Sequence, residues 1–315
     1  MRILINHAFG EDEIETLRDL APGHEVVVAR TEAEAVELVA TAEVLLTRIA
    51  RPVLAAGRNV RWIQTTSSGV DPFVLPEPCV AEEVVLTSMA GVKADQGSEH
   101  AWALLLALSR GIYSSVPNQP HCAWHGGGAG VQNGGTLGIG GLGGFGMGMA
   151  EKGAGFGMRV LAVDLVRRDK PDCVAELMPA TRENLHDLLR RSDAVMIACP
   201  LTKQTRGLIG QEELVAMKES AFLVHVTRGG IVDEEALIEA LEGGGIAGAA
   251  LDVCAEEPLP AESPLWGTTN LIITPHRAAG SQHGRRQVFE FFCDNLRRYL
   301  NGEPLVNVVD LERGF

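Results

Sequence analysis

The sequence predicts an α/β fold with two doubly wound parallel sheets, and two observations support it. Short apolar segments alternate with helical segments along most of the 315 residues, as expected when helices cover both faces of parallel sheets. A glycine-dense segment at 136–146 then opens a second and longer series of such units. A chain of this length can bury two separate cores.

The first part of the chain predicts a small sheet. Apolar strands are expected at 2–6, 26–29, 44–47 and 60–66, with helices at 11–20 and 32–40. A strongly apolar helix follows at 95–112, with Asp95 or Ser98 as its N-cap. Its composition favours burial between domains or subunits. The Gly-, Pro- and Ser-rich segment 114–135 predicts a surface connection.

The second series predicts a larger sheet. Strands are expected at 136–140, 159–163, 194–198, 221–226, 246–251 and 271–273, and helices at 145–156, 181–191, 211–218 and 233–242. A long helix at 284–300 closes the chain. We therefore expect one domain at 97–281, inserted into a second domain formed by 1–96 and 282–315.

Composition and charge limit the classes of function. Lys and Arg total 27 against 41 Asp and Glu, a net charge of −14, which argues against a nucleic-acid partner. No apolar run reaches the ~18 residues of a membrane span, and the N-terminus does not resemble a secretion signal. We expect a cytoplasmic protein without a membrane or nucleic-acid partner, in which local cations attract any anionic substrate.

The cysteines and histidines give little support for a metal site. The six cysteines are scattered without a CxxC pair, which favours buried, reduced thiols. The segment 121–125, HCAWH, contains possible metal ligands. It lacks a second ligand pair and precedes a polyglycine stretch, so a loop is favoured and no metal is expected.

The glycine-dense segment fits the dinucleotide-binding pattern GxGxxG at Gly141, Gly143 and Gly146. In that pattern the first glycine allows a tight turn, the second lets the pyrophosphate approach the backbone, and the third packs helix against strand. The spacing alone is weak evidence in a segment so rich in glycine. An apolar strand before it, a helix after it and the strand at 159–163 strengthen the interpretation.

Asp164 stands at the end of that next strand, where an acidic residue binds the ribose hydroxyls of the cofactor. A carboxylate there repels a 2′-phosphate, so NAD is favoured over NADP. Arg167 and Arg168 follow closely and would weaken this preference. The alternative is an Asp that only caps a turn.

Three later segments place polar residues directly after predicted strands: VHVTRGG at 224–230, LDVCAEEP at 251–258 and TPHRAAG at 274–280. Arg228 offers a bidentate fork for a carboxylate, and His276 is suited to donate a proton to a carbonyl oxygen. Glu257 would favour the imidazolium and fix its tautomer. Alone, such a His is more often structural and such an Arg-Gly-Gly is usually a turn. Their shared position at strand ends favours a catalytic site.

Taken together, these segments resemble the D-isomer-specific 2-hydroxyacid dehydrogenase family. The similarity covers nearly the whole chain and also includes SSGVD (67–71), SEHAWALLLAL (98–108), CPLTKQTRGLIG (199–210) and PLVNVVDLERGF (304–315). It implies a Rossmann NAD domain inserted into a flavodoxin-like substrate domain, a cleft between them, and a homodimer joined largely through the NAD domain.

The resemblance also implies roles for individual residues. Arg228 would bind the 2-oxo acid, Glu257 would pair with the acid/base His276, and Asp252 would hold the nicotinamide carboxamide. Substrate would contact Ser68, Gly69, Val70, Arg228 and His276, while Arg48 would meet a phosphate or second carboxylate or be merely solvated. The cofactor would contact Gly141, Gly143, Gly144, Phe145, Gly146, Asp164, Cys199, Pro200, Val226, Thr227, Arg228, Asp252, His276, Ala278 and Ala279.

Three positions depart from the family's pattern. A cationic residue followed by Ile is common where Gly144-Phe145 stands, Asn is common where His225 stands, and a basic residue is common at Gly135. The expected activity is NADH-dependent reduction of a small 2-oxo acid such as glyoxylate or hydroxypyruvate. The alternatives are a phosphoglycerate dehydrogenase-like enzyme and an NAD(H)-sensing, corepressor-like scaffold.

Overall fold

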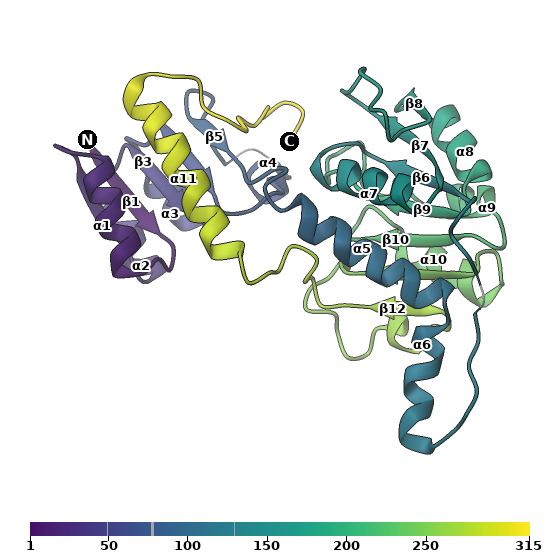
Figure 1. The fold of residues 1–315 in the computed structure, drawn as a ribbon. Coiled ribbons are helices and arrows are strands. Elements are labelled where there is room, and N and C mark those ends of the chain that lie inside the picture. The colour runs from purple at the N-terminus through teal and green to yellow at the C-terminus, as the bar shows by residue number, and fades with distance from the viewer. Residues whose placement is uncertain (49, 77–78, 129) are drawn as a thin grey trace. The chain divides into compact units, whose positions relative to one another are not determined.

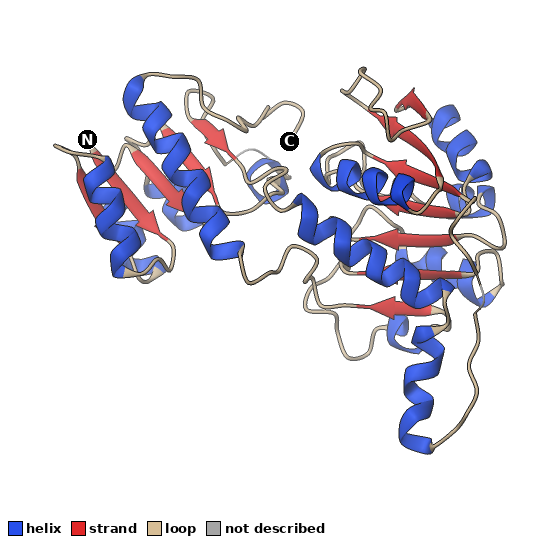
Figure 2. Ribbon diagram, in the orientation of Figure 1, coloured by secondary structure: helices blue, strands red, loops and turns tan. Residues whose placement is uncertain are grey.

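A computed structural model describes residues 1–48, 50–76, 79–128 and 130–315 of the chain. These residues form two compact units, the terminal unit (Met1–Val92 and Ser281–Phe315) and the central unit (Lys93–Gly280). Each contains one parallel sheet with helices on both faces, which confirms the predicted fold class (Figures 1 and 2). The central unit begins before the predicted residue 97, because it includes the whole of helix α5 (Ala94–Ser109).

The terminal unit has a sheet in the order β2-β1-β3-β4-β5, the flavodoxin-like order. Its strands are β1 (Arg2–Asn6), β2 (Glu25–Val28), β3 (Val44–Thr47), β4 (Trp62–Thr65) and β5 (Val85–Thr87). Its helices are α1 (Glu11–Leu20), α2 (Glu32–Val39), α3 (Arg51–Ala56), α4 (Asp71–Val74) and α11 (Gly284–Asn301).

Apolar side chains fill both faces of this sheet. One cluster joins β1, β3 and β4 to α1 and α11, and Trp62 stacks there on Phe292 with ring centroids 5.6 Å apart. The other cluster, which includes Leu45, Val53 and Phe73, packs α2, α3 and α4 on the opposite face. Because α11 comes from the end of the chain, the C-terminal segment completes the core of the N-terminal part.

The central unit has a seven-stranded sheet in the order β12-β11-β10-β9-β6-β7-β8. Its strands are β6 (Thr136–Gly140), β7 (Arg159–Asp164), β8 (Glu176–Pro179), β9 (Ala194–Ile197), β10 (Phe222–His225), β11 (Gly248–Leu251) and β12 (Leu271–Ile273). The strand order reverses between β6 and β9, and ligands bind at such a switch point in open α/β sheets. The glycine segment follows β6 at this point.

Helices cover both faces of the central sheet (Figures 1 and 2). Helices α5 and α7 (Gly144–Gly155) pack together on one face. The other face carries α8 (Arg182–Arg191), α9 (Gln211–Ala216) and α10 (Glu234–Glu242). Within the described ranges, no helix is long and apolar enough to cross a bilayer.

Several short elements escaped the sequence analysis. Helices α3 and α4, strand β5 and the edge strand β8 are brief and lack a complete apolar period. Helix α5 ends at Ser109 rather than 112, because Gly111 adopts a left-handed φ of 66° and starts the short helix α6 (Ile112–Ser115). A 3-10 helix at Val116–His121 then occupies part of the predicted surface connection.

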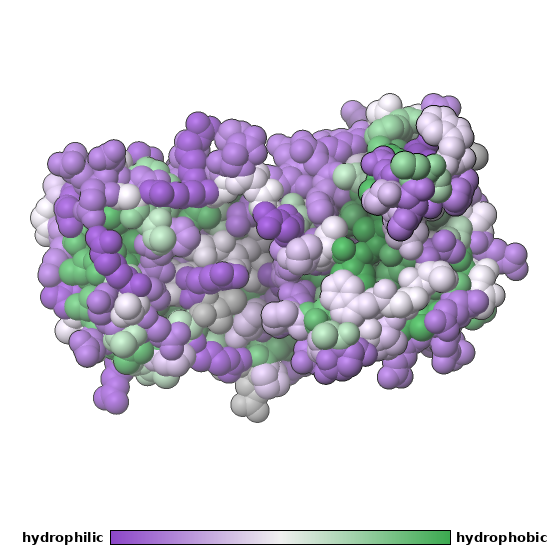
Figure 3. Space-filling view, turned by 90° about the horizontal axis from the view of Figure 1, so that it is seen from below, coloured by the Kyte–Doolittle hydropathy of each residue, from purple (hydrophilic) through white to green (hydrophobic). Residues whose placement is uncertain are grey.

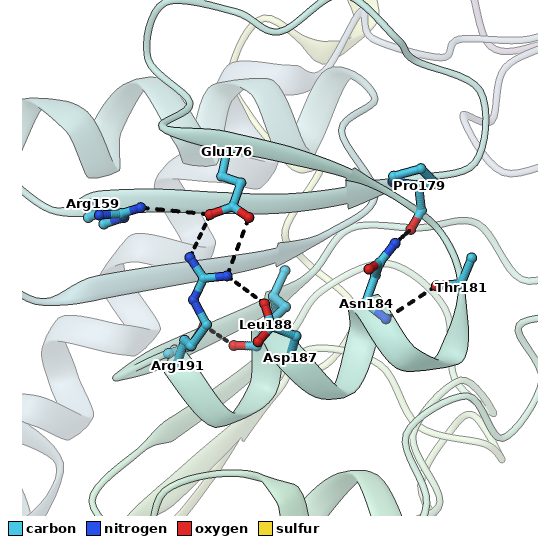
Figure 4. A network of polar contacts seen from close by, with 9 residues as sticks. Arg159, Glu176, Pro179, Thr181, Asn184, Asp187, Leu188 and Arg191 are labelled. Atoms are coloured by element: carbon cyan, nitrogen blue, oxygen red, sulfur yellow. Dashed lines mark hydrogen bonds and ion pairs between the residues drawn. The ribbon is translucent and has the colours of Figure 1, made fainter.

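An ion-pair network holds the edge strand β8 to α8 (Figure 4). Arg191 contacts Glu176 of β8 at 2.6 Å and also pairs with Asp187 one turn earlier in its own helix. The hydrogen bond from Arg191 lowers the pKa of Glu176. These side chains are more than one-third exposed, so the network fixes geometry more than it adds stability.

Candidate active site

The three residues proposed for catalysis all lie in the central unit. Arg228, Glu257 and His276 follow the adjacent parallel strands β10, β11 and β12, so the loops that carry them leave the same edge of the sheet. The Nδ1 atom of His276 lies 2.6 Å from Oε2 of Glu257. Because a carboxylate only accepts, Nδ1 carries the proton and Nε2 is left for acid/base chemistry. The two side chains are partly exposed, at 42% and 36%.

The loop of His276 is anchored on the buried Asp252. The carboxylate of Asp252 accepts hydrogen bonds from the hydroxyl of Thr274 (2.6 Å) and from the backbone amides of Arg277 (2.9 Å) and Ala278 (2.7 Å). The amide of His276 itself donates to the backbone carbonyl of Asp252 at 2.8 Å. These bonds hold His276 at φ 51°, a left-handed conformation that is uncommon for non-glycine residues.

His100 joins the same network from helix α5. Its Nε2 lies 3.0 Å from the Thr274 hydroxyl and 3.3 Å from the Asp252 carboxylate. Burial alone would raise the pKa of Asp252, but the hydrogen bonds from His100, Thr274 and the two amides outweigh it and hold that pKa below its usual value. The sequence analysis missed His100, although it lies within the recognised segment SEHAW.

Arg228 lies in a turn pressed against the loop that contains Glu257. A Cβ atom at Gly229 would lie 1.8 Å from the carbonyl oxygen of Cys254, so only glycine permits this approach. The amide of Cys254 donates to Oε1 of Glu257 at 3.0 Å, which orients the carboxylate toward His276. The backbone therefore couples the Arg228 turn to the Glu257–His276 pair.

His225, the last residue of β10, is buried and donates from Nε2 to the carbonyl oxygen of Arg228 at 2.6 Å. Burial lowers the pKa of His225 to about 4, so the ring is neutral at physiological pH. The role of this side chain was not foreseen, and only the difference from the family's Asn drew attention to it.

Acid should destabilise the protein through His225. The unfolded chain binds a proton at this ring near pH 6.5, whereas the folded chain does so only near pH 4. Stability is therefore lost as pH falls from about 6.5 to 4, by about 2–3 kcal/mol at pH 4.5. Urea unfolding at pH 7 and pH 4.5 measures the decrease in the free energy of unfolding between the two pH values. This decrease should be smaller by that amount in His225→Gln than in the wild type. An equal loss in both proteins would mean that His225 is not buried as a neutral ring.

The glycine loop has the geometry of a phosphate-binding turn. Gly141 has a φ of 96°, and a Cβ there would lie 2.7 Å from the amide nitrogen of Cys199. A Cβ at Gly146 would lie 2.0 Å from the carbonyl oxygen of Gly141, whereas the space around Gly143 is open. Gly143 is the N-cap of α7, whose first amides supply donors and a positive dipole.

Asp164 lies at the end of β7 and binds the glycine loop directly. Its Oδ2 accepts from the amide of Leu142 at 2.7 Å, and its Oδ1 accepts from the amides of Val166 (2.8 Å) and Arg167 (2.6 Å). The carboxylate thus caps a turn, as the alternative interpretation expected, and also bonds to the glycine loop; its role in ribose binding stays a prediction. The guanidinium of Arg168 bonds to the carbonyls of Leu165 and Arg167.

The expected preference for NAD over NADP should fall by at least about tenfold in kcat/KM in Asp164→Ala, because a negative charge would no longer face the added phosphate. Loss of the bond to Leu142 should also raise the KM for NADH. Steady-state rates with both cofactors measure the effect, with the exposed Asp172→Ala as control. An unchanged ratio in Asp164→Ala would remove this carboxylate from ribose recognition.

The other predicted cofactor residues surround the same loops. The ring of Phe145 packs on Gly97 of α5, so this residue offers only its backbone to a phosphate. Burial raises the pKa of Cys199 to about 12, which leaves it an inert thiol, and the carbonyl of Pro200 accepts from Thr205. The hydroxyl oxygen of Thr227 is buried and has no hydrogen-bond partner within the described parts of the chain. This unsatisfied group and the open glycine loop fit a bound dinucleotide.

The predicted substrate residues Ser68, Gly69, Val70 and Arg48 lie in the terminal unit. Ser68 follows β4, and its hydroxyl donates to the carbonyl of Met89 at 3.0 Å. Val70 is buried at the start of α4, and Arg48 is exposed after β3. Residue 49, which follows Arg48, lies outside the described residues.

Comparison with known proteins places these loops in context. The family model for the NAD-binding domain of D-isomer specific 2-hydroxyacid dehydrogenases matches residues 102–278. A glyoxylate reductase from Korarchaeum cryptofilum is 33% identical over 313 residues, which cover 95% of this chain and 90% of the relative. A D-3-phosphoglycerate dehydrogenase from Methanocaldococcus jannaschii is 30% identical over 99% of this chain but only 60% of its own length.

A solved structure of a reductase is also similar to this chain. The NADPH-dependent glyoxylate/hydroxypyruvate reductase of Sinorhizobium meliloti, in complex with NADP and sulfate, superposes with a TM-score of 0.84. It is 26% identical, and the match covers 100% of this chain and 99% of the other. The fold of this chain is therefore similar to that of an NADPH-dependent reductase over its whole length.

Proposed function

Because this chain belongs to the D-isomer specific 2-hydroxyacid dehydrogenase family, we propose that it reduces glyoxylate or hydroxypyruvate with NADH. The observation that carries the proposal is the 2.6 Å contact between His276 and Glu257 beside the turn of Arg228. A histidine with one nitrogen held by a carboxylate and the other left for proton transfer is suited to general acid–base catalysis. Arg228 supplies the cation that an otherwise acidic protein needs to bind an anionic substrate.

Each of these side chains has a distinct role in the proposed reaction. The guanidinium of Arg228 binds the carboxylate and the 2-oxo group of the substrate and polarises the carbonyl. When bound, the nicotinamide supplies the hydride that C2 of the substrate accepts. His276 donates the Nε2 proton to the carbonyl oxygen, which yields the 2-hydroxy acid. Glu257 balances the positive charge of the imidazolium beforehand and keeps the Nδ1 proton in place.

We propose that the central unit also holds the cofactor. The amides at Gly143–Gly146 would bind the pyrophosphate, and Asp164 would accept from the adenosine ribose. Val226, Thr227, Ala278 and Ala279 would line the nicotinamide, and the unsatisfied hydroxyl of Thr227 supports that role. The carboxylate of Asp252, which was expected to hold the carboxamide, is completely buried and instead binds the amide of Ala278. In the terminal unit, the amides of Ser68, Gly69 and Val70 would receive the substrate carboxylate.

The alternatives are less well supported. A phosphoglycerate dehydrogenase-like activity would give the exposed Arg48 a phosphate to bind, but the relative of that name is 30% identical to this chain against 33% for the glyoxylate reductase. A corepressor-like scaffold would not need the paired His276 and Glu257. We therefore retain the small 2-oxo acid reductase as the proposed function.

Consumption of NADH in the presence of a panel of 2-oxo acids tests the proposal. We expect turnover with glyoxylate and hydroxypyruvate, and weaker turnover with 3-phosphohydroxypyruvate. Turnover restricted to the phosphorylated acid would favour the phosphoglycerate dehydrogenase-like alternative. Absence of turnover with every acid, despite tight NADH binding, would favour the scaffold.

The cytoplasmic location stays a prediction from the sequence.

We further propose that the chain forms a homodimer through the central unit. Helix α6 and the following 3-10 helix project from the unit (Figure 1) and expose Ile112 and Val116, and Trp124 is exposed just after the 3-10 helix. Apolar surface is visible at and beside this projection in Figure 3. Exposed apolar side chains gathered in one region are typical of a protein interface.

Substitutions on the projection should weaken the dimer. Removing two apolar anchors from an interface costs on the order of 1–3 kcal/mol each, enough to shift a micromolar sample toward monomer. Sedimentation velocity of Val116→Ser/Trp124→Ser against the wild type measures the shift, with the exposed Val215→Ser in α9 as control. A wild type that sediments as a monomer would contradict the proposal.

A further inference from the structure

We infer that His225 is a positioning residue that sets Arg228 for substrate binding, an inference that rests on the proposed function. The Nε2–H of His225 donates to the backbone carbonyl of Arg228 over 2.6 Å, and the side chain is buried. Its backbone carbonyl accepts from the amide of Asp252 at 2.9 Å. One residue at the end of β10 therefore holds both the Arg228 turn and the first residue of the loop that anchors His276.

The chemistry of this contact indicates that His225 fixes the orientation of the Arg228 turn and does not only fill space in the core. A carbonyl oxygen only accepts, so Nε2 must carry the proton, and the neutral ring keeps that tautomer. The bond closes the turn from His225 to Arg228 on itself. The acceptor of this hydrogen bond is the backbone of Arg228, the residue whose side chain would bind the substrate carboxylate. The next residue, Gly229, lies against Cys254.

Loss of the donor would remove this partner from the carbonyl of Arg228, which lies in a partly buried place. The turn would then rotate to satisfy the carbonyl, and the guanidinium would move with it. Misplacement of a substrate-binding group by about 1 Å costs as much as 10²-fold in rate. The glycine loop and Asp164 follow β6 and β7 and would keep their contacts with the cofactor, so NADH binding would weaken less than glyoxylate binding, even though Val226 and Thr227 belong to the turn.

Two variants separate the hydrogen bond from the volume of the side chain. His225→Gln keeps a neutral N–H donor at similar reach, whereas His225→Phe keeps a planar ring but has no donor. We expect the KM for glyoxylate to rise about tenfold or more in His225→Phe, with kcat reduced less. His225→Gln should recover most of the wild-type KM. The Kd for NADH, measured by fluorescence titration, should change less than twofold in His225→Gln and should rise by a smaller factor than the KM for glyoxylate in His225→Phe. NADH binding also shows that each variant is folded.

A double-mutant cycle with Arg228→Gln decides whether His225 acts through Arg228. If it does, His225→Phe should add less than twofold to the KM of the Arg228→Gln protein. A full tenfold effect in that background, or equal KM values for the Phe and Gln variants, would overturn the inference. Failure of the proposed function looks different, because the wild type itself would then not reduce glyoxylate.

Discussion

Replacement of His276 by alanine should lower kcat for glyoxylate reduction by about 10²–10⁴-fold, the usual contribution of a general acid. The substrate carbonyl would then have to take its proton from water, while the cofactor loops after β6 and β7 are left intact. Stopped-flow or steady-state NADH consumption measures the loss, and the Kd for NADH should stay within about twofold.

A second histidine–carboxylate pair in the central unit provides a matched control. In that pair, Nε2 of His186 on α8 lies 2.8 Å from Oε1 of Glu213 on α9, on the side of the sheet away from α5 and α7. His186→Ala should therefore leave kcat within about twofold of the wild type. Near-normal turnover in His276→Ala would remove His276 from the mechanism.

Replacement of Arg228 by glutamine should reduce kcat/KM for 2-oxo acids by about 10²–10⁴-fold. A bidentate pair to a carboxylate comprises two charge-assisted hydrogen bonds, each worth about 1.5–3 kcal/mol. The effect should appear in KM as well as kcat, because Arg228 binds the ground state and also polarises the carbonyl. Arg228→Lys, which keeps the charge but loses the fork, should recover only part of the loss.

Arg182 on α8 serves as a control for the change in net charge. It pairs with Glu212 at the surface of the central unit, so Arg182→Gln should leave kcat/KM nearly unchanged. If Arg228→Gln reduced glyoxylate with an unchanged KM, the substrate carboxylate would have to bind elsewhere.

The sequence predicted both sheets because their strands are short, apolar and separated by amphipathic helices. Strand β8 was missed because an edge strand carrying Glu176 and Pro179 has no continuous apolar run, and it is held by Arg191 instead. The end of α5 was misplaced because the apolar pattern continues through Gly111 to Ile112, although the backbone turns at Gly111. Local pattern therefore predicted the elements better than their ends.

For the candidate site, the sequence predicted the main residues but not the contacts that hold them in place. Strand ends and family resemblance indicated Arg228, Glu257 and His276, and the structure brings Glu257 and His276 into contact. The support around them was not predictable, because His100 meets Thr274 across 174 residues of sequence. A burial-dependent tautomer such as that of His225 likewise depends on tertiary packing that no local pattern encodes.

Transfer of deuterium from NADH that carries two deuterium atoms at C4 of the nicotinamide tests the central claim most directly. After incubation with glyoxylate, the proposed reaction predicts glycolate that carries deuterium at C2, detected by NMR or mass spectrometry. Very little deuterated glycolate should form over the same time with His276→Ala. Glycolate without deuterium, or oxidation of NADH without glycolate, would contradict hydride transfer to a 2-oxo acid.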